Sequence, residues 1–154
     1  MKKTYSLIAI LAAVMLSATL VSCDDGWVPA PGPGPGNTFY DYSLTGCWEL
    51  YQVNSTPVLP SEMNWMEFNG NGRGWYYYLR NGAPYEERMN YWCEYSYNSV
   101  SDYQINISYG NGSPTTMNYW FTHGGNYLWM QWYSYNHGTT TYVYRSVSGL
   151  PQPR

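Results

Sequence analysis

The sequence predicts an all-β protein, an eight-stranded antiparallel up-and-down barrel that follows a cleaved leader and a Pro/Gly-rich tether. From Gly46 onward, short runs rich in Tyr, Trp and Thr alternate with turn clusters rich in Gly and Asn. These aromatic and β-branched residues favour pleated strands, and Asn-Gly pairs tolerate the positive φ of tight hairpins. No apolar pattern with the period of a helix runs through this part of the chain. Strands joined by short hairpins form a meander, and its closure into a barrel removes the exposed edges.

Residues 1–22 have the pattern of a secretory signal. Lys2 and Lys3 precede an apolar run from Leu7 to Leu16, which is too short to span a membrane as a helix. The segment Leu20-Val21-Ser22-Cys23 then resembles the lipobox of bacterial lipoproteins. This resemblance implies cleavage before Cys23 and attachment of lipid to its sulfur and new amino terminus. The alternative is a plain secretory signal that happens to be followed by a cysteine.

Residues 23–43 are predicted to form the lipidated cysteine and a tether. Trp27 to Asn37 alternates Pro and Gly, which builds neither a helix nor a sheet interior, so we expect a spacer. A ligand for a proline-recognising partner is the alternative. Asp24 and Asp25 resemble the surface-export signal of some Gram-negative lipoproteins, but they are equally consistent with solvated charges. The expected location is therefore the outer membrane, either surface-exposed or facing the periplasm.

The barrel is predicted to span residues 44–148, and residues 149–154 form a tail. Eight strands account for the barrel, and each is bounded by turn residues. The predicted strands are Cys47–Val53, Asn64–Asn69, Gly74–Arg80, Arg88–Tyr97, Tyr103–Tyr109, Thr116–Thr122, Tyr127–Tyr133 and Thr140–Val147.

The start of the barrel resembles the lipocalin family. Gly46-Cys47-Trp48 looks like the lipocalin Gly-x-Trp signature, and Phe68 to Gly74 is similar to a hairpin of small bacterial lipocalin-like lipoproteins. The resemblance covers Leu44 to Val147 and implies an eight-stranded up-and-down barrel. It also implies that Arg145 packs over the indole of Trp48, as a late arginine does in lipocalins; the alternative is a solvated arginine. The chain leaves little room for the long helix that follows the barrel in larger lipocalins.

The barrel interior is expected to be aromatic, because Ile, Leu and Val are scarce after the leader. Eight strands enclose a space that side chains just fill or that holds one small ligand, and large rings favour the filled case. Strand alternation predicts which residues face inward. The predicted inner faces hold Trp48 and Leu50, Met66 and Phe68, Tyr103, Ile105 and Ile107, and Met117, Tyr119 and Phe121. A filled barrel has no void for a fatty acid.

Cys47 and Cys93 remain once Cys23 carries lipid. If Trp48 and Trp92 both point inward, both thiols point outward from strands that are not neighbours. We therefore expect two free thiols, because a disulfide needs Cα atoms within about 7 Å. The alternative is a disulfide, which an exported compartment permits.

The motifs of enzymes, metal sites and cofactor sites are missing from the sequence, which predicts a non-enzymatic protein with no cofactor. His123 and His137 lie in Gly-rich turns without paired cysteines or spaced carboxylates, so no metal site is expected. Glu49, Glu67 and Glu94 lie on predicted strands, and two of them facing each other would form a hydrolase pair. Solvent-facing carboxylates are the preferred interpretation.

Binding is the function that the composition favours. After the leader, five arginines oppose ten acidic residues, a balance that does not suit nucleic acid. Trp and Tyr rings stack on sugar faces, and Asn amides bind hydroxyl groups, so a polysaccharide is the preferred ligand. The candidate binding residues are Trp75, Tyr77, Trp120, Trp129 and Trp132. The alternative is a protein-interaction or inhibitor scaffold at the cell envelope, because Tyr and Trp also anchor protein interfaces.

Overall fold

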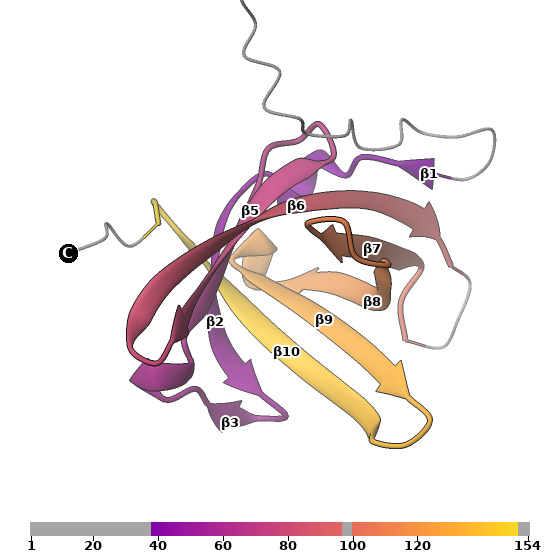
Figure 1. Cartoon of the computed structure of the whole chain (residues 1–154). Coiled ribbons are helices and arrows are strands. Elements are labelled where there is room, and N and C mark those ends of the chain that lie inside the picture. The colour runs from indigo at the N-terminus through magenta and orange to yellow at the C-terminus, as the bar shows by residue number, and fades with distance from the viewer. Residues whose placement is uncertain (1–37, 97–99, 151–154) are drawn as a thin grey trace, which may run out of the picture.

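The computed structural model describes residues 38–96 and 100–150, and it shows a β-barrel (Figure 1). The barrel strands are β2 (Gly46–Val53), β4 (Asn64–Phe68), β5 (Arg73–Arg80), β6 (Ala83–Tyr95), β7 (Tyr103–Tyr109), β8 (Thr115–Thr122), β9 (Tyr127–Ser134) and β10 (Gly138–Val147). Two-residue strands and 3-10 turns complete it: β1 (Thr38–Phe39), β3 (Thr56–Pro57), η1 (Tyr42–Leu44), η2 (Pro60–Glu62) and η3 (His123–Gly125). Within residues 38–96 and 100–150, no helix has the length and apolarity that crossing a membrane requires.

The barrel is closed by pairing in an unbroken antiparallel ring. The first and last barrel strands, β2 and β10, pair with each other, and β6 pairs with both β5 and β7. The predicted fold class, an eight-stranded antiparallel up-and-down barrel, is confirmed. Closure matters for the site because it turns one face of every strand toward a common interior.

Most predicted strand boundaries differ from the structure by at most two residues, but the start of β6 is wrong by five. The predicted strand starts at Arg88, but pairing with β5 begins at Ala83. Asn81 and Gly82 form a two-residue turn with φ values of 53° and 77°, so the strand resumes directly after it. Pro84 lies in this strand, opposite Leu79. The strand ends at Tyr95, and Tyr97 lies outside the described residues.

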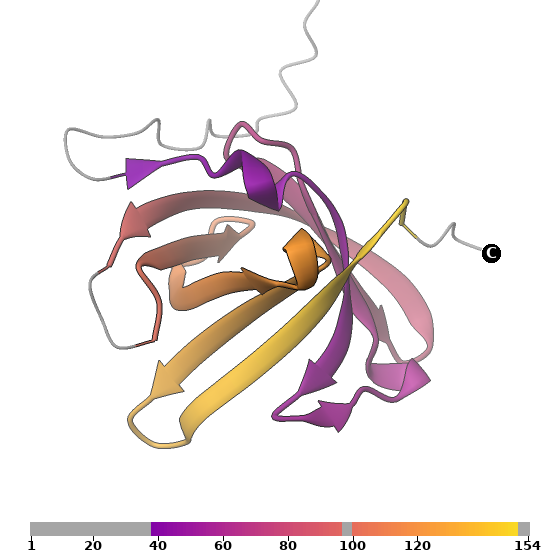
Figure 2. The ribbon, with the colours of Figure 1, turned by 180° about the vertical axis from the view of Figure 1, so that it is seen from behind.

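One end of the barrel is closed by the segment that precedes it. In both views β1 and η1 lie at the top, whereas the β2–β3 and β9–β10 turns lie at the bottom (Figures 1 and 2). Leu44 is fully buried, and its carbonyl accepts a hydrogen bond of 2.7 Å from Nε1 of Trp48. Asp41 accepts a hydrogen bond of 2.8 Å from the hydroxyl of Tyr119. Residues 38–44, mostly assigned to the tether from sequence, therefore belong to the folded barrel.

The interior is less aromatic than predicted. Its buried core is Leu44, Trp48, Leu50, Met66, Phe68, Met89, Tyr91, Cys93, Ile105, Ile107, Met117, Tyr119, Leu128, Met130 and Tyr144. The predicted inner faces are confirmed except for Tyr103, which is 40% exposed at the start of β7; Phe121 is partly buried and packs against the core. Four methionines belong to this core, where mostly aromatic rings were predicted. Their unbranched side chains adapt to irregular gaps.

The cysteines are free, as predicted, but for a different reason. Cys93 is fully buried in the core, and the adjacent Trp92 points outward and donates a hydrogen bond of 3.0 Å to Glu94. The assumption that Trp92 faces inward is therefore wrong. Cys47 is half-buried on β2, and neither thiol is bridged. Burial raises the pKa of Cys93 to about 11, so this thiol is protonated and unreactive at neutral pH.

Candidate binding site

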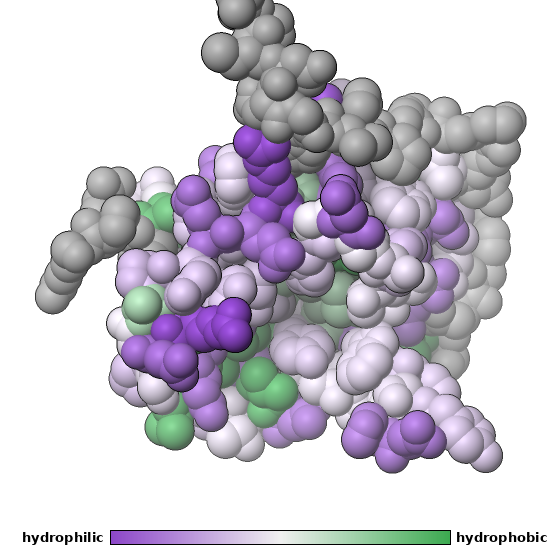
Figure 3. All heavy atoms as spheres, in the orientation of Figure 1, coloured by the Kyte–Doolittle hydropathy of each residue, from purple (hydrophilic) through white to green (hydrophobic). Residues whose placement is uncertain are grey.

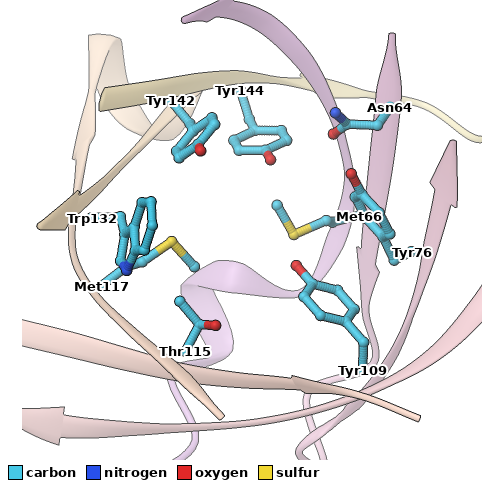
Figure 4. A pocket seen from close by; sticks show the side chains of 9 residues that line it. All are labelled: Asn64, Met66, Tyr76, Tyr109, Thr115, Met117, Trp132, Tyr142 and Tyr144. Atoms are coloured by element: carbon cyan, nitrogen blue, oxygen red, sulfur yellow. The ribbon is translucent and has the colours of Figure 1, made fainter. Parts of the chain in front are cut away.

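The barrel is hollow at the end opposite η1. A cavity of about 280 Å³ lies inside the strands, where the sequence analysis expected a filled interior. Nine residues line it: Asn64, Met66, Tyr76, Tyr109, Thr115, Met117, Trp132, Tyr142 and Tyr144 (Figure 4). The prediction that side chains fill the whole barrel is therefore wrong at this end.

The lining follows from strand alternation. Each strand places every second residue on its inner face, so Asn64 with Met66 and Tyr142 with Tyr144 share the lumen. Toward the closed end the same faces carry core residues such as Phe68. Toward the mouth they carry Tyr, Trp, Asn and Thr, whose polar groups need water or a ligand.

Four tyrosines give the cavity its chemistry. Figure 4 shows the hydroxyl groups of Tyr109 and Tyr144 pointing into it from opposite sides. Burial raises the pKa of Tyr76 to about 12, with the neighbouring Tyr142 and Glu87 adding to the shift. Burial likewise holds the pKa values of Tyr109 and Tyr144 well above the usual range. The phenols of Tyr76, Tyr109 and Tyr144 are therefore neutral at physiological pH, so each donates one hydrogen bond and accepts others.

Asn64 leaves a polar atom unpaired in this lining. Its Oδ1 atom is buried and has no hydrogen-bond partner within the described structure. Figure 4 shows the amide directed toward the cavity from the start of β4. Buried polar groups are nearly always paired, so this acceptor marks a position where a donor is missing.

The predicted binding residues divide between the two faces of the barrel. Trp132 lines the cavity. Trp75 and Tyr77 lie on the outer face of β5 with ring centroids 6.5 Å apart, and Trp75 carries the Arg88 guanidinium 5.7 Å from its ring. They do not form one site with Trp132.

Trp120 and Trp129 form a second outer pair. Their rings are stacked, with centroids 5.8 Å apart and an angle of 18° between the planes. They are neighbours because β8 and β9 pair them directly. The five predicted residues therefore lie in three places.

Sequence reasoning missed most of the cavity. The tyrosines and Asn64 were not singled out, although the alternation that placed Met66 and Met117 inward also places Asn64 and Thr115 inward. Most of these lining residues can be recognised in the sequence because each lies two residues from a core residue on the same strand face, on the side of the barrel mouth. Asn64 stands in this way before Met66, and Thr115 before Met117. Four of the five predicted binding residues were tryptophans, but only Trp132 lines the cavity. Without the strand register, a sequence does not show whether an indole lies on the inner or the outer face of the barrel.

Arg145 does not pack over Trp48, which corrects the implication of the lipocalin resemblance. The register places Arg145 opposite Glu49, so its side chain lies on the outer face while Trp48 points inward. Its Nε and Nη2 atoms both lie 2.5 Å from Oε2 of Glu49, and its guanidinium lies 5.5 Å from the ring of Tyr51. Ring contacts of Trp48 come instead from Phe121, at 5.8 Å between centroids.

No catalytic arrangement reaches the cavity among the described residues. Glu49 is engaged by Arg145, Glu94 accepts from Trp92, and Glu67 lies opposite Cys47, so none of these carboxylates lines the cavity. Within residues 38–96 and 100–150, no group of three His, Cys, Asp or Glu side chains is placed to hold a metal ion.

Comparison with known proteins yields similar structures but no similar sequence. No protein-family model matches the chain, and no curated protein matches it significantly. Lobster apocrustacyanin A1 is 18% identical over 71% of this chain, with a TM-score of 0.40, and the match spans less than two thirds of its length, 64%. Apocrustacyanin C2 is 17% identical over 82% of this chain and 79% of its own, with a TM-score of 0.41. The function is therefore inferred from the cavity itself.

Proposed function

We propose that this protein is a non-enzymatic binding barrel that takes a small uncharged ligand into the cavity at its mouth. The observation that carries the proposal is the cavity of about 280 Å³, which is lined by nine uncharged residues. Ligand sites are typically concave, largely apolar and supplied with a few converging polar groups. The tyrosine hydroxyls and the amide of Asn64 are such groups.

The electrostatics of the lining favour an uncharged ligand. None of the nine residues carries a charge. The carboxylate of Glu87 lies close enough to Tyr76 and Tyr109 to raise the pKa of both. An anionic ligand such as a fatty acid would lose its hydration there without gaining a cation.

A lipid anchor at Cys23 is part of the proposal. Cys23 lies outside the described residues, so the support for the anchor is the lipobox in the sequence. Thr38, where the described chain begins, is at the closed end of the barrel. A tether attached there would hold the mouth away from an outer membrane, on either its surface or its periplasmic side.

The outer face supports a second candidate function, the docking of a polysaccharide or of a protein. The stacked Trp120 and Trp129 rings offer a flat platform of the kind that such partners use. Figure 3 shows the most hydrophobic residues of one face as separate spots among polar ones, and the outer pair offers two rings where the cavity brings nine side chains together. The cavity is therefore the preferred site.

Tryptophan emission distinguishes the two sites. The purified protein is titrated with methyl glucoside, cyclohexylmethanol and laurate. An uncharged probe should change the emission of the wild type and of Trp129→Phe but not of Trp132→Phe, because Trp132 lines the cavity and Trp129 does not. Laurate should not bind at submicromolar concentration.

The opposite pattern would place binding elsewhere. A response that persists in Trp132→Phe and disappears in Trp129→Phe would move the site to the outer face. A response to none of the uncharged probes would contradict the luminal site.

A further inference from the structure

We infer that the ligand of the luminal cavity is a single pyranose ring, either a free monosaccharide or the terminal unit of a longer chain. This inference rests on the proposed function and names the chemical class of its ligand. It differs from the docking of a polysaccharide on the outer-face rings, because the sugar would enter the barrel between the tyrosines.

The size of the cavity fits one sugar ring. An apolar protein cavity of about 150 Å³ accommodates benzene, which indicates that about 280 Å³ holds roughly eleven non-hydrogen atoms. This is close to the size of one hexose. A long acyl chain or a sterol is too large for the same space.

The hydrogen-bonding groups fit hydroxyl groups. Each luminal tyrosine hydroxyl and that of Thr115 both donates and accepts, as each sugar hydroxyl does. The amide of Asn64 adds a donor and an acceptor to the lining, and its Oδ1 atom has no protein partner, so a ligand with hydroxyl groups complements it better than an apolar one. An apolar ring, or a ring with only acceptors, would leave this atom unsatisfied.

The apolar part of the lining fits the faces of a pyranose. Tyr76, Trp132 and Tyr144 contribute rings, and Met66 and Met117 contribute flexible thioethers (Figure 4). A pyranose presents C–H groups on its faces and hydroxyls around its rim, so it matches a site of rings and hydroxyls. None of the nine lining residues is Ile, Leu or Val, the residues that would favour an aliphatic ligand.

Calorimetric titration of the full protein with methyl glucoside, methyl galactoside and methyl N-acetylglucosaminide tests the inference, with cyclohexylmethanol and indole as ring-sized controls. At least one glycoside should saturate at one per chain and bind at least tenfold more tightly than cyclohexylmethanol. Asn64→Leu should weaken that glycoside at least tenfold without weakening cyclohexylmethanol. Asn118→Leu, the same substitution on the outer face of β8, should change neither.

Tyr144→Phe is a second variant that removes one luminal hydroxyl and keeps the ring. It should also weaken the glycoside, and thermal melting of each variant establishes that it is folded. If indole or cyclohexylmethanol binds more tightly than every glycoside, and does so through Trp132, the sugar assignment is overturned while the luminal binding function stands. If no probe binds at all, both the sugar assignment and the proposed function fail.

Discussion

At the scale of single residues, Asn64 combines a stability cost with a proposed role. Its buried Oδ1 atom is unpaired, and such an atom typically costs about 1–3 kcal/mol of stability. Asn64→Leu keeps the approximate size of the side chain and removes the unpaired group. We therefore expect the free energy of unfolding to rise by about 1 kcal/mol, measured by urea denaturation. A lower stability would show that the amide is paired in solution and would remove the argument for a missing donor.

At the scale of secondary-structure elements, Trp48 connects the η1 turn to β2, the first barrel strand. It is 3% exposed and donates to the carbonyl of Leu44. Trp48→Ala should lower the free energy of unfolding by about 3–5 kcal/mol, the range for large buried aromatic truncations. Trp120→Ala, on the half-exposed outer face, is the matched control and should cost much less. Equal losses for both variants would mean that the burial of Trp48 and its bond to Leu44 stabilise the barrel no more than an outer-face indole does.

The same elements show how far sequence alone reaches. The eight strands were predictable because turn signals bound them and alternation identifies Trp48, Met66 and Ile105 as core residues. The role of η1 in closing one end of the barrel was not predictable from the sequence. A short 3-10 turn has no periodic signal, and its burial depends on distant partners such as Tyr119. The cavity was not predictable either, because inward-facing Tyr and Met side chains are large enough to suggest that they fill the barrel interior. Only the register distinguishes Trp132 inside from Trp129 outside.

At the scale of the whole molecule, the buried tyrosines predict alkaline sensitivity. Burial raises the pKa of Tyr76 and of Tyr91 to about 12, above the usual value of about 10 for an unfolded chain. Between these values the unfolded chain loses protons that the folded barrel retains. The contribution of these neutral tyrosines to the free energy of unfolding is therefore complete below pH 10. It is lost as the pH rises toward 12, by at most about 1.4 kcal/mol per pH unit for each tyrosine.

Denaturation midpoints measured at a series of alkaline pH values, together with phenolate absorbance, check this prediction. The buried phenols should ionise only as the barrel unfolds. Complete ionisation of all tyrosines near pH 10 in a folded barrel would show that the lumen and the core are open to water.

The proposed lipid anchor on Cys23 would determine where the whole molecule is located. Cys23→Ser should abolish metabolic labelling by fatty acid and move the protein from the membrane to the soluble fraction, because acyl chains supply the membrane affinity. Cys47→Ser, a matched change at a half-buried barrel cysteine, should leave labelling unaltered. Persistent labelling of the Cys23 variant would exclude this residue as the lipidation site.

The most direct measurement is a crystal structure of the protein soaked with the glycoside that binds most tightly in titration. We expect electron density for one sugar ring inside the barrel, between Tyr76, Trp132 and Tyr144, with a hydroxyl hydrogen-bonded to the amide of Asn64. Density for the sugar on the stacked rings of Trp120 and Trp129, with only water in the lumen, would contradict it.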